Sequence, residues 1–253
     1  MAVPIEILRG ALKNIESELG VNIVYLLYNE QKEIERAHIK KIKKFLDSLK
    51  YESAIVILEG IGGDTNAGKL LALDLGLKFR MGMFIAIPNF ALSSLVYCIF
   101  PARTLIMDNS GYIGPVEPLI KDKKSSMVIP ISVLQLMKSG DIEQRNKAIK
   151  YWIDKANFIL ELLELFRPSI IHEYNELHVD QIVEIVKPFM CSPHNRKIFK
   201  TDLIKAHLHI LDATNKEYWK QIQLFVSNRK SEIITDRHIQ FVIGDSNNEF
   251  IFT

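Results

Sequence analysis

Short apolar runs alternate with segments of helical period through the first 140 residues of the chain. Continuous apolar runs of this kind are typical of strands that are buried on both faces, as in parallel sheets. Such a succession of strands and helices favours a mostly parallel sheet covered by helices, so the sequence predicts an α/β fold. The predicted helices cover residues 5–19, 31–49, 66–75 and 91–100, and the predicted strands cover residues 21–28, 54–58, 83–87 and 103–107.

The second half of the chain is less regular. Residues 142–166 carry apolar side chains along one side of a long predicted helix, which Pro168 ends. Trp219 and Phe225 fall on another predicted helix, and a β-like segment ends at residues 250–252. No repeat, low-complexity tract or linker divides the chain, so we expect one compact domain over residues 1–210 with a C-terminal extension over 211–253.

The composition narrows the functional class. The net charge of +2 is near neutral and the lysines at 41, 43 and 44 share a helix with acidic residues, so no nucleic-acid partner is indicated. Cys98 and Cys191 form no disulfide framework and are interpreted as buried thiols in a reducing compartment. Since no secretory signal and no uninterrupted apolar segment of about 18–20 residues is found, the sequence predicts a cytoplasmic protein without a membrane span.

A turn rich in glycine follows the predicted strand at 54–58 and resembles a nucleotide site. Residues 63–69 fit the first seven positions of a phosphate-binding P-loop. That loop needs a Ser or Thr directly after its lysine to hold magnesium, whereas Leu70 follows Lys69 here. The sequence therefore disfavours a nucleotide site, and we expect Lys69 to be a solvent-facing helix residue.

The same glycines also suit a site for acyl transfer. Gly62 and Gly63 lack a Cβ atom, which lets their backbone amides approach a substrate oxyanion. Ser93 lies where a buried strand gives way to an apolar helix, and the helix dipole favours a nucleophile at that position. A second interpretation is that Ser93 only caps the helix. Acyl transfer requires that the fold bring both turns together.

Segments in four places of the chain carry a family resemblance. They are Gly60-Ile61-Gly62-Gly63, Ala91-Leu92-Ser93-Ser94-Leu95, Ile113-Gly114-Pro115-Val116-Glu117-Pro118 and His194-Asn195-Arg196-Lys197-Ile198. In order, these are similar to the motifs T-P-G-G, A-M-S-G-G, L-G-P-x-D-P and H-D-x-P-I of the serine dehydrogenase proteinase family. That family belongs with Clp protease and signal peptide peptidase A among serine peptidases of the Clp/crotonase fold. The resemblance spans residues 22–210.

This resemblance implies a serine peptidase domain over residues 1–210, built from Clp/crotonase-like stacked β-β-α units. It implies that Ser93 is the nucleophile and that the amides of Gly62, Gly63 and Ser94 form the oxyanion hole. The implied activity is that of a serine endopeptidase on peptide or protein substrates, with no metal and no cofactor. The implied assembly is a homo-oligomer.

The general base is less well defined than the nucleophile. A serine attacks efficiently only when a histidine or a desolvated lysine accepts its proton. Relatives of the signal peptide peptidase type use a lysine downstream of the serine, which points to Lys138, and His194 falls within a family motif. The alternative for Lys138 is a surface residue near a helix end. For His194 it is an ordinary loop histidine.

Departures from the family motifs leave two other functions open. Ser94 and Leu95 replace glycines, and no histidine follows at the position that Clp proteases use. These changes allow a catalytically silent homologue that acts as an oligomeric interaction scaffold. A third hypothesis is acyl-CoA chemistry on a crotonase-like fold, for which a glycine oxyanion hole would suffice.

Overall fold

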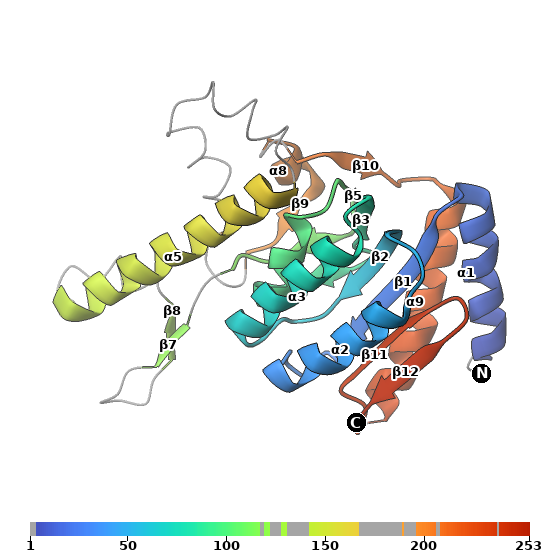
Figure 1. Ribbon diagram of the computed structural model, residues 1–253, viewed down its shortest axis with the longest axis horizontal. Coiled ribbons are helices and arrows are strands. Elements are labelled where there is room, and N and C mark those ends of the chain that lie inside the picture. The colour runs from blue at the N-terminus through green and yellow to red at the C-terminus, as the bar shows by residue number, and fades with distance from the viewer. Residues whose placement is uncertain are drawn as a thin grey trace.

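The computed structural model describes residues 4–116, 119–121, 128–130, 142–166, 189, 196–205, 208–236 and 238–253. A seven-stranded sheet runs through its centre in the order β10-β5-β3-β2-β1-β11-β12 (Figure 1). The first five strands of that order are parallel, while β11 and β12 add an antiparallel edge. These strands are β1 (Asn22–Tyr28), β2 (Ser53–Glu59), β3 (Gly82–Ala86), β5 (Thr104–Met107), β10 (Ile210–Asp212), β11 (Phe241–Asp245) and β12 (Glu249–Phe252).

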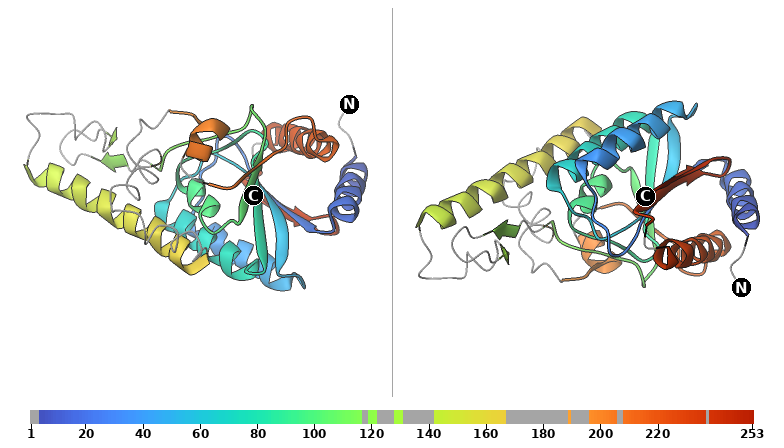
Figure 2. Two further views of the ribbon diagram at one scale, coloured as in Figure 1. Left: turned by 90° about the horizontal axis from the view of Figure 1, so that it is seen from above. Right: turned by 90° about the horizontal axis from the view of Figure 1, so that it is seen from below.

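Helices cover both faces of the sheet, as Figures 1 and 2 show. Successive residues of a strand point to opposite faces, so Val24 and Leu26 of β1 join one buried cluster while Ile23 and Tyr25 join the other. The first cluster lies under α2 (Arg36–Ser48) and α3 (Thr65–Lys78), and the second under α1 (Ile5–Leu19) and α9 (Glu217–Thr235). The predicted α/β class, with a mostly parallel sheet covered by helices, is confirmed.

Residues 211–253, the segment that the sequence assigns to an extension, contribute to this central sheet. β11 pairs with β1 over five residue pairs, and β12 pairs with β11. From the same segment, α9 buries Trp219, Ile222 and Phe225 against the sheet. Asp108, at the end of β5, accepts hydrogen bonds of 2.9 Å from both Trp219 Nε1 and Gln223 Nε2, which attach α9 to the turn.

A smaller sheet lies beside the carboxyl ends of the parallel strands. It has the order β4-β6-β9, formed by Phe90–Ala91, Tyr112–Ile113 and Ile198–Phe199, and is followed by α8 (Lys200–Lys205). A separate hairpin pairs β7 (Leu119–Lys121) with β8 (Val128–Pro130). An isolated bridge between Gly60 and Ala91 joins the small sheet to the end of β2.

The long helix α5 (Ile142–Phe166) packs along α3 and extends away from the central sheet (Figure 1). Lys155 contacts Thr65, Lys69 lies over the Phe158 ring, and Phe166 meets Gly76, so the two helices run in the same direction. A Cβ on Gly76 would lie 2.6 Å from Phe166 Cζ, so any larger residue there would displace the Phe166 ring. None of the helices in the described part of the chain is both long and apolar enough to cross a membrane.

Differences from the predicted helices arise where the chain makes tertiary contacts. The helix expected at 31–49 begins at Arg36, because Ile34 pairs with Gly63 in a short parallel bridge and Glu35 then caps the helix. The helix expected at 91–100 is the strand β4 followed by the 3₁₀ helix η1 (Ser93–Ile99).

Candidate functional site

The two predicted turns lie against each other in the structure. The Gly60 amide donates to the Phe90 carbonyl at 3.3 Å, and the Leu92 amide donates to the Gly60 carbonyl at 3.0 Å. These bonds hold the glycine turn that follows β2 beside the segment that leads into η1. The condition that the sequence set for an acyl-transfer site is therefore met.

Gly62 makes the closest approach between the turns. A Cβ on Gly62 would lie 2.5 Å from the Leu92 carbonyl oxygen, 2.7 Å from Ser93 Cβ and 2.9 Å from the Ser94 nitrogen. Its φ of 85° is in the left-handed region that glycine tolerates best. Both the space and the backbone conformation at this position require glycine.

Ser93 has the strained backbone often found at functional positions. Its φ is 51°, and Asn215 is the only other non-glycine residue of the described chain with a positive value. Ser93 is the first residue of η1, whose N-cap is Leu92, and no side chain caps this helix. The capping interpretation of Ser93 is therefore wrong. Its half-buried hydroxyl forms no hydrogen bond with any residue that the structure describes.

Several backbone amides of the two turns make no hydrogen bond among the described residues. The Ile34 amide donates to the Gly62 carbonyl at 2.7 Å, and the Asp64 amide donates to the Ile34 carbonyl at 2.9 Å. In such a parallel bridge, the peptide groups of Gly63 itself point away from the partner strand. Within the described residues, no hydrogen bond uses the amides of Gly62, Gly63 or Ser94. These are the amides that the family resemblance assigns to an oxyanion hole.

The side chains that replace the family's glycines point into the core. Ser94 is 1% exposed, and its Cβ would lie 2.6 Å from a Cβ on Gly68 of α3. Leu95 is fully buried, and its Cδ1 would lie 2.8 Å from a Cβ on Gly60. These two substitutions fill space between η1 and its neighbours, and both side chains are buried away from solvent.

The third segment of the family resemblance contacts the Ser93 turn through Gly114. The Gly114 amide donates to the Ala91 carbonyl at 3.0 Å, and a Cβ on Gly114 would lie 3.0 Å from Leu92 Cδ2. Glu117 and Pro118 of this motif lie outside the described residues, as do the two predicted bases Lys138 and His194. Cys98 is buried as expected, and Cys191 lies outside the described part.

Lys69 is not the solvent-facing residue that the sequence predicted. It is half-buried, with its ammonium group 4.4 Å from the centre of the Phe158 ring and 5.9 Å from that of Tyr97. Burial lowers the pKa of Lys69, against the opposing effects of Glu161 and Asp154. The turn before it continues into α3, where the Asp64 carboxylate caps the helix by accepting from the Ala67 amide at 2.7 Å.

Lys155 is a second cation near the site, and sequence reasoning missed it. Only 3% of the residue is exposed, and its Nζ donates to Thr65 Oγ1 at 3.4 Å. Thr65 starts α3 directly after the glycine turn, and Gly68 of the same first turn touches Ser94. The sequence did contain a signal for the burial of Lys155. This lysine lies four residues before the buried Ile159, on the apolar side of α5.

A buried ionic cluster lies next to the two turns and was also missed. Glu59, the last residue of β2, is fully buried and accepts a hydrogen bond of 2.8 Å from Asn89 Nδ2. Lys230 of α9 pairs with Glu59 and with Glu30, and its ammonium lies 4.7 Å from the centre of the Phe90 ring. Burial raises the pKa of the Glu59 carboxyl, although Lys230 and Asn89 act in the opposite direction.

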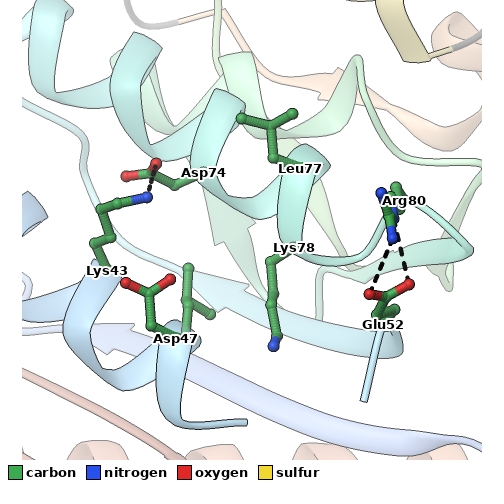
Figure 3. A pocket seen from close by; sticks show the side chains of 8 residues that line it. Lys43, Asp47, Glu52, Asp74, Leu77, Lys78 and Arg80 are labelled. Carbon is green, nitrogen blue, oxygen red and sulfur yellow. Dashed lines mark hydrogen bonds and ion pairs between the residues drawn. The ribbon is translucent and has the colours of Figure 1, made fainter. Parts of the chain in front are cut away.

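A surface pocket lies at the other end of the parallel strands, near the starts of β2 and β3 (Figure 3). Its charged groups compensate one another: Lys43 pairs with Asp74 at 3.3 Å, and Arg80 pairs with Glu52 at 3.2 Å. Lys78 donates to the Leu49 carbonyl at 2.6 Å. Apart from Asp74, the paired side chains are exposed, and the pocket is remote from both turns, so it is not part of the candidate site.

Solved structures similar to the chain include two kinds of protein. A 1510-N membrane-bound stomatin-specific protease is 12% identical, with a TM-score of 0.48 over 75% of this chain and 79% of that one. The same protease in complex with a substrate peptide is 13% identical, with a TM-score of 0.33 over 76% and 90%. A protein assigned as an enoyl-CoA hydratase/isomerase from Acinetobacter baumannii is 15% identical, with a TM-score of 0.38 over 85% and 92%. No family model and no curated protein matches the chain.

Proposed function

We propose that this chain is a serine-type acyl hydrolase of the Clp/crotonase kind, which acts on peptide or protein substrates through Ser93. The observation that carries the proposal is the packing of Gly62 against the Ser93–Ser94 turn. This contact brings the turn that carries the strained residue Ser93 against the glycine turn, in which no other described group uses the amides of Gly62 and Gly63. Acyl transfer needs a hydroxyl that attacks the carbonyl carbon, and the tetrahedral oxyanion that results needs amide donors held in place in advance.

In the proposed reaction, the Ser93 hydroxyl attacks the carbonyl carbon of the substrate and gives its proton to a base. The negative charge on the former carbonyl oxygen is accepted by amides of Gly62, Gly63 and Ser94. Collapse of this intermediate breaks the bond to the leaving amine, which takes the proton from the base and leaves an acyl-serine. Water then hydrolyses the ester with the same base as proton acceptor.

Three residues are candidates for the base. Lys138 and His194 are proposed from the family resemblance, and Lys155 is proposed from its position beside the start of α3. Among the three, Lys155 is the candidate that lies in the described part of the chain.

Hydrolysis of a peptide library tests the proposed function. We expect the wild type to cleave peptides and the Ser93→Ala variant to lose this activity, while Ser94→Ala keeps it because Ser94 faces the core. Ser94 makes a matched control, since its buried hydroxyl has no hydrogen-bond partner among the described residues. Cleavage that survives in Ser93→Ala contradicts the proposal.

The second candidate function is a catalytically silent scaffold that assembles as a homo-oligomer. It is favoured by one observation, the absence of any hydrogen bond between the Ser93 hydroxyl and a described base. A silent scaffold predicts no cleavage by the wild type together with self-association in light scattering. Cleavage by the wild type but not by Ser93→Ala excludes it.

A further inference from the structure

The ammonium group of Lys230 contacts each of the chain segments that carry the candidate site. Lys230 lies on α9, far from Ser93 in the sequence, and its side chain is only 11% exposed. Its Nζ pairs with Glu59 beside the glycine turn and lies over the ring of Phe90 in the segment that leads to Ser93. It also pairs with Glu30. Glu30 lies in the loop that leads to Ile34, the residue that forms the bridge with Gly63.

The Glu59 carboxylate connects the two turns directly. Glu59 immediately precedes Gly60, and Asn89 immediately precedes Phe90. The hydrogen bond from Asn89 Nδ2 to Glu59 Oε2 therefore lies next to the backbone bridge between Gly60 and Ala91. Since Lys230 pairs with the other carboxylate oxygen, the orientation of this side-chain link depends on α9.

Glu30 extends the same ionic cluster to the third segment. The loop after Glu30 places Ile34 in its bridge with Gly63, with hydrogen bonds to Gly62 and Asp64. The Glu30 side chain is 44% exposed, whereas that of Glu59 is 1% exposed. Removal of one partner is therefore expected to cost more at the buried pair than at the exposed one.

Electrostatics make Lys230 difficult to replace. Burial disfavours its charge, but hydrogen bonds and attraction from Glu30 and Glu59 outweigh that effect, and the pKa of Lys230 is raised. Removal of one partner from a buried ion pair leaves an uncompensated charge, which is strongly unfavourable. Without Lys230, Glu59 must take up a proton or move toward water, and either change disturbs its link to Asn89.

We propose that Lys230 is a positioning residue of the site. It sets the spacing between the glycine turn and the Ser93 turn from outside, so α9 controls the geometry of the oxyanion amides relative to the nucleophile. Its effect on catalysis rests on the proposed function, whereas its effect on the two turns does not.

Two measurements on Lys230→Met test this proposal, because methionine keeps most of the side-chain length and removes the charge. Hydrogen exchange followed by mass spectrometry reports on residues 29–34, 59–63 and 89–94. The rate constant and the half-saturation concentration for labelling by a fluorophosphonate probe report on Ser93. The matched control is Lys220→Met, since Lys220 lies on the same helix in an exposed pair with Glu217.

We expect all three segments to exchange about tenfold faster in Lys230→Met, while the rest of the sheet keeps its protection. The maximal labelling rate should fall about tenfold with little change in half-saturation, because misplaced reacting groups impair chemistry more than binding. Lys220→Met should match the wild type in both measurements. The proposal is overturned if these segments exchange in Lys230→Met at the wild-type rate. It is also overturned if the probe labels the wild type and labels Lys230→Met equally fast.

A second variant keeps the test decisive if Lys230→Met does not fold. Glu59→Gln combined with Lys230→Met removes both buried charges and keeps an acceptor for Asn89, a replacement that buried pairs often tolerate. The proposal still predicts faster exchange at residues 29–34 and 89–94, because Glu30 and Phe90 lose their contacts with the Lys230 ammonium, and wild-type exchange there overturns it. If the wild type itself takes no probe, the proposed function fails, and the exchange data alone decide the role of Lys230.

Discussion

Gly62 lies so close to Ser93 that a Cβ on Gly62 would come within 2.7 Å of Ser93 Cβ. The contact joins two turns that follow different strands, and neither the Gly62 amide nor the Ser93 hydroxyl forms a hydrogen bond among the described residues. A single methyl group added at Gly62 is therefore expected to disturb the packing of the two turns.

Gly62→Ala should therefore impair both the fold and the site. The added methyl would meet the Leu92 carbonyl at 2.5 Å, and a φ of 85° is unfavourable for alanine. We expect a loss of about 2–4 kcal/mol in the free energy of unfolding, measured with urea.

Gly10→Ala is the control, since a Cβ there meets nothing within 4 Å on helix α1. That change should stabilise the protein by about 0.5–1 kcal/mol. Equal effects of the two variants would contradict this account of the turn.

Lys155→Met tests the candidate base that the structure describes. We expect fluorophosphonate labelling of Ser93 to slow by about 100-fold, a loss typical for removal of a general base. Lys150→Met is the control, because Lys150 is exposed on the same helix. Wild-type labelling in Lys155→Met would assign the proton acceptor to Lys138 or His194 instead.

Asp108→Asn should destabilise the attachment of α9 in a pH-dependent way. Burial acts to raise the pKa of Asp108, but hydrogen bonds from Ser110, Trp219 and the Gly111 amide outweigh it and lower the pKa below 3.8. A carboxylate with a lowered folded-state pKa contributes stability above about pH 4, which is lost as the pH falls through that lowered value. We expect a cost of about 1–3 kcal/mol at pH 7 that shrinks toward pH 3, measured from urea unfolding.

Asp47→Asn is the matched control for this experiment, since Asp47 is exposed on α2. Its effect should stay within about 0.5 kcal/mol at every pH. A difference between wild type and Asp108→Asn that stays constant from pH 7 to pH 3 would show that the charge of Asp108 does not matter.

Cys98 should be chemically inert in the folded protein. The thiol is fully buried, and burial raises its pKa, so both access and thiolate formation are suppressed. We expect iodoacetamide to modify the peptide that contains Cys98 at least about 100-fold more slowly in buffer than in urea, measured by mass spectrometry. Rapid modification without denaturant would contradict the burial of η1 against α3.

Much of the architecture could be predicted because long periodic segments carry a strong signal. The bounds of α1 and α5 match the predicted residues 5–19 and 142–166, since both helices have an extended apolar stripe. The start of α2 was wrong by five residues, because a bridge between Ile34 and Gly63 competes with helix formation there. That bridge depends on a distant turn, which local periodicity does not report.

The sequence pointed to the two turns but not to the buried lysines around them. Glycine at 62 and serine at 93 are visible in the sequence because turns after buried strands need particular residues. The burial of Lys69, Lys155 and Lys230 was not predicted, because each is buried by partners from other elements. A lysine on a helix usually faces solvent, and only the packing of α5 and α9 reverses that expectation.

The most direct test of the account is the identity of the residue that reacts with a fluorophosphonate. Mass spectrometry of labelled wild type should place the adduct on Ser93, and Ser94→Ala should carry the same adduct at the same rate. Ser93→Ala should take up no probe while it keeps the wild-type unfolding midpoint. An unlabelled wild type, or equal labelling of Ser93→Ala, would contradict the assignment of Ser93 as the nucleophile.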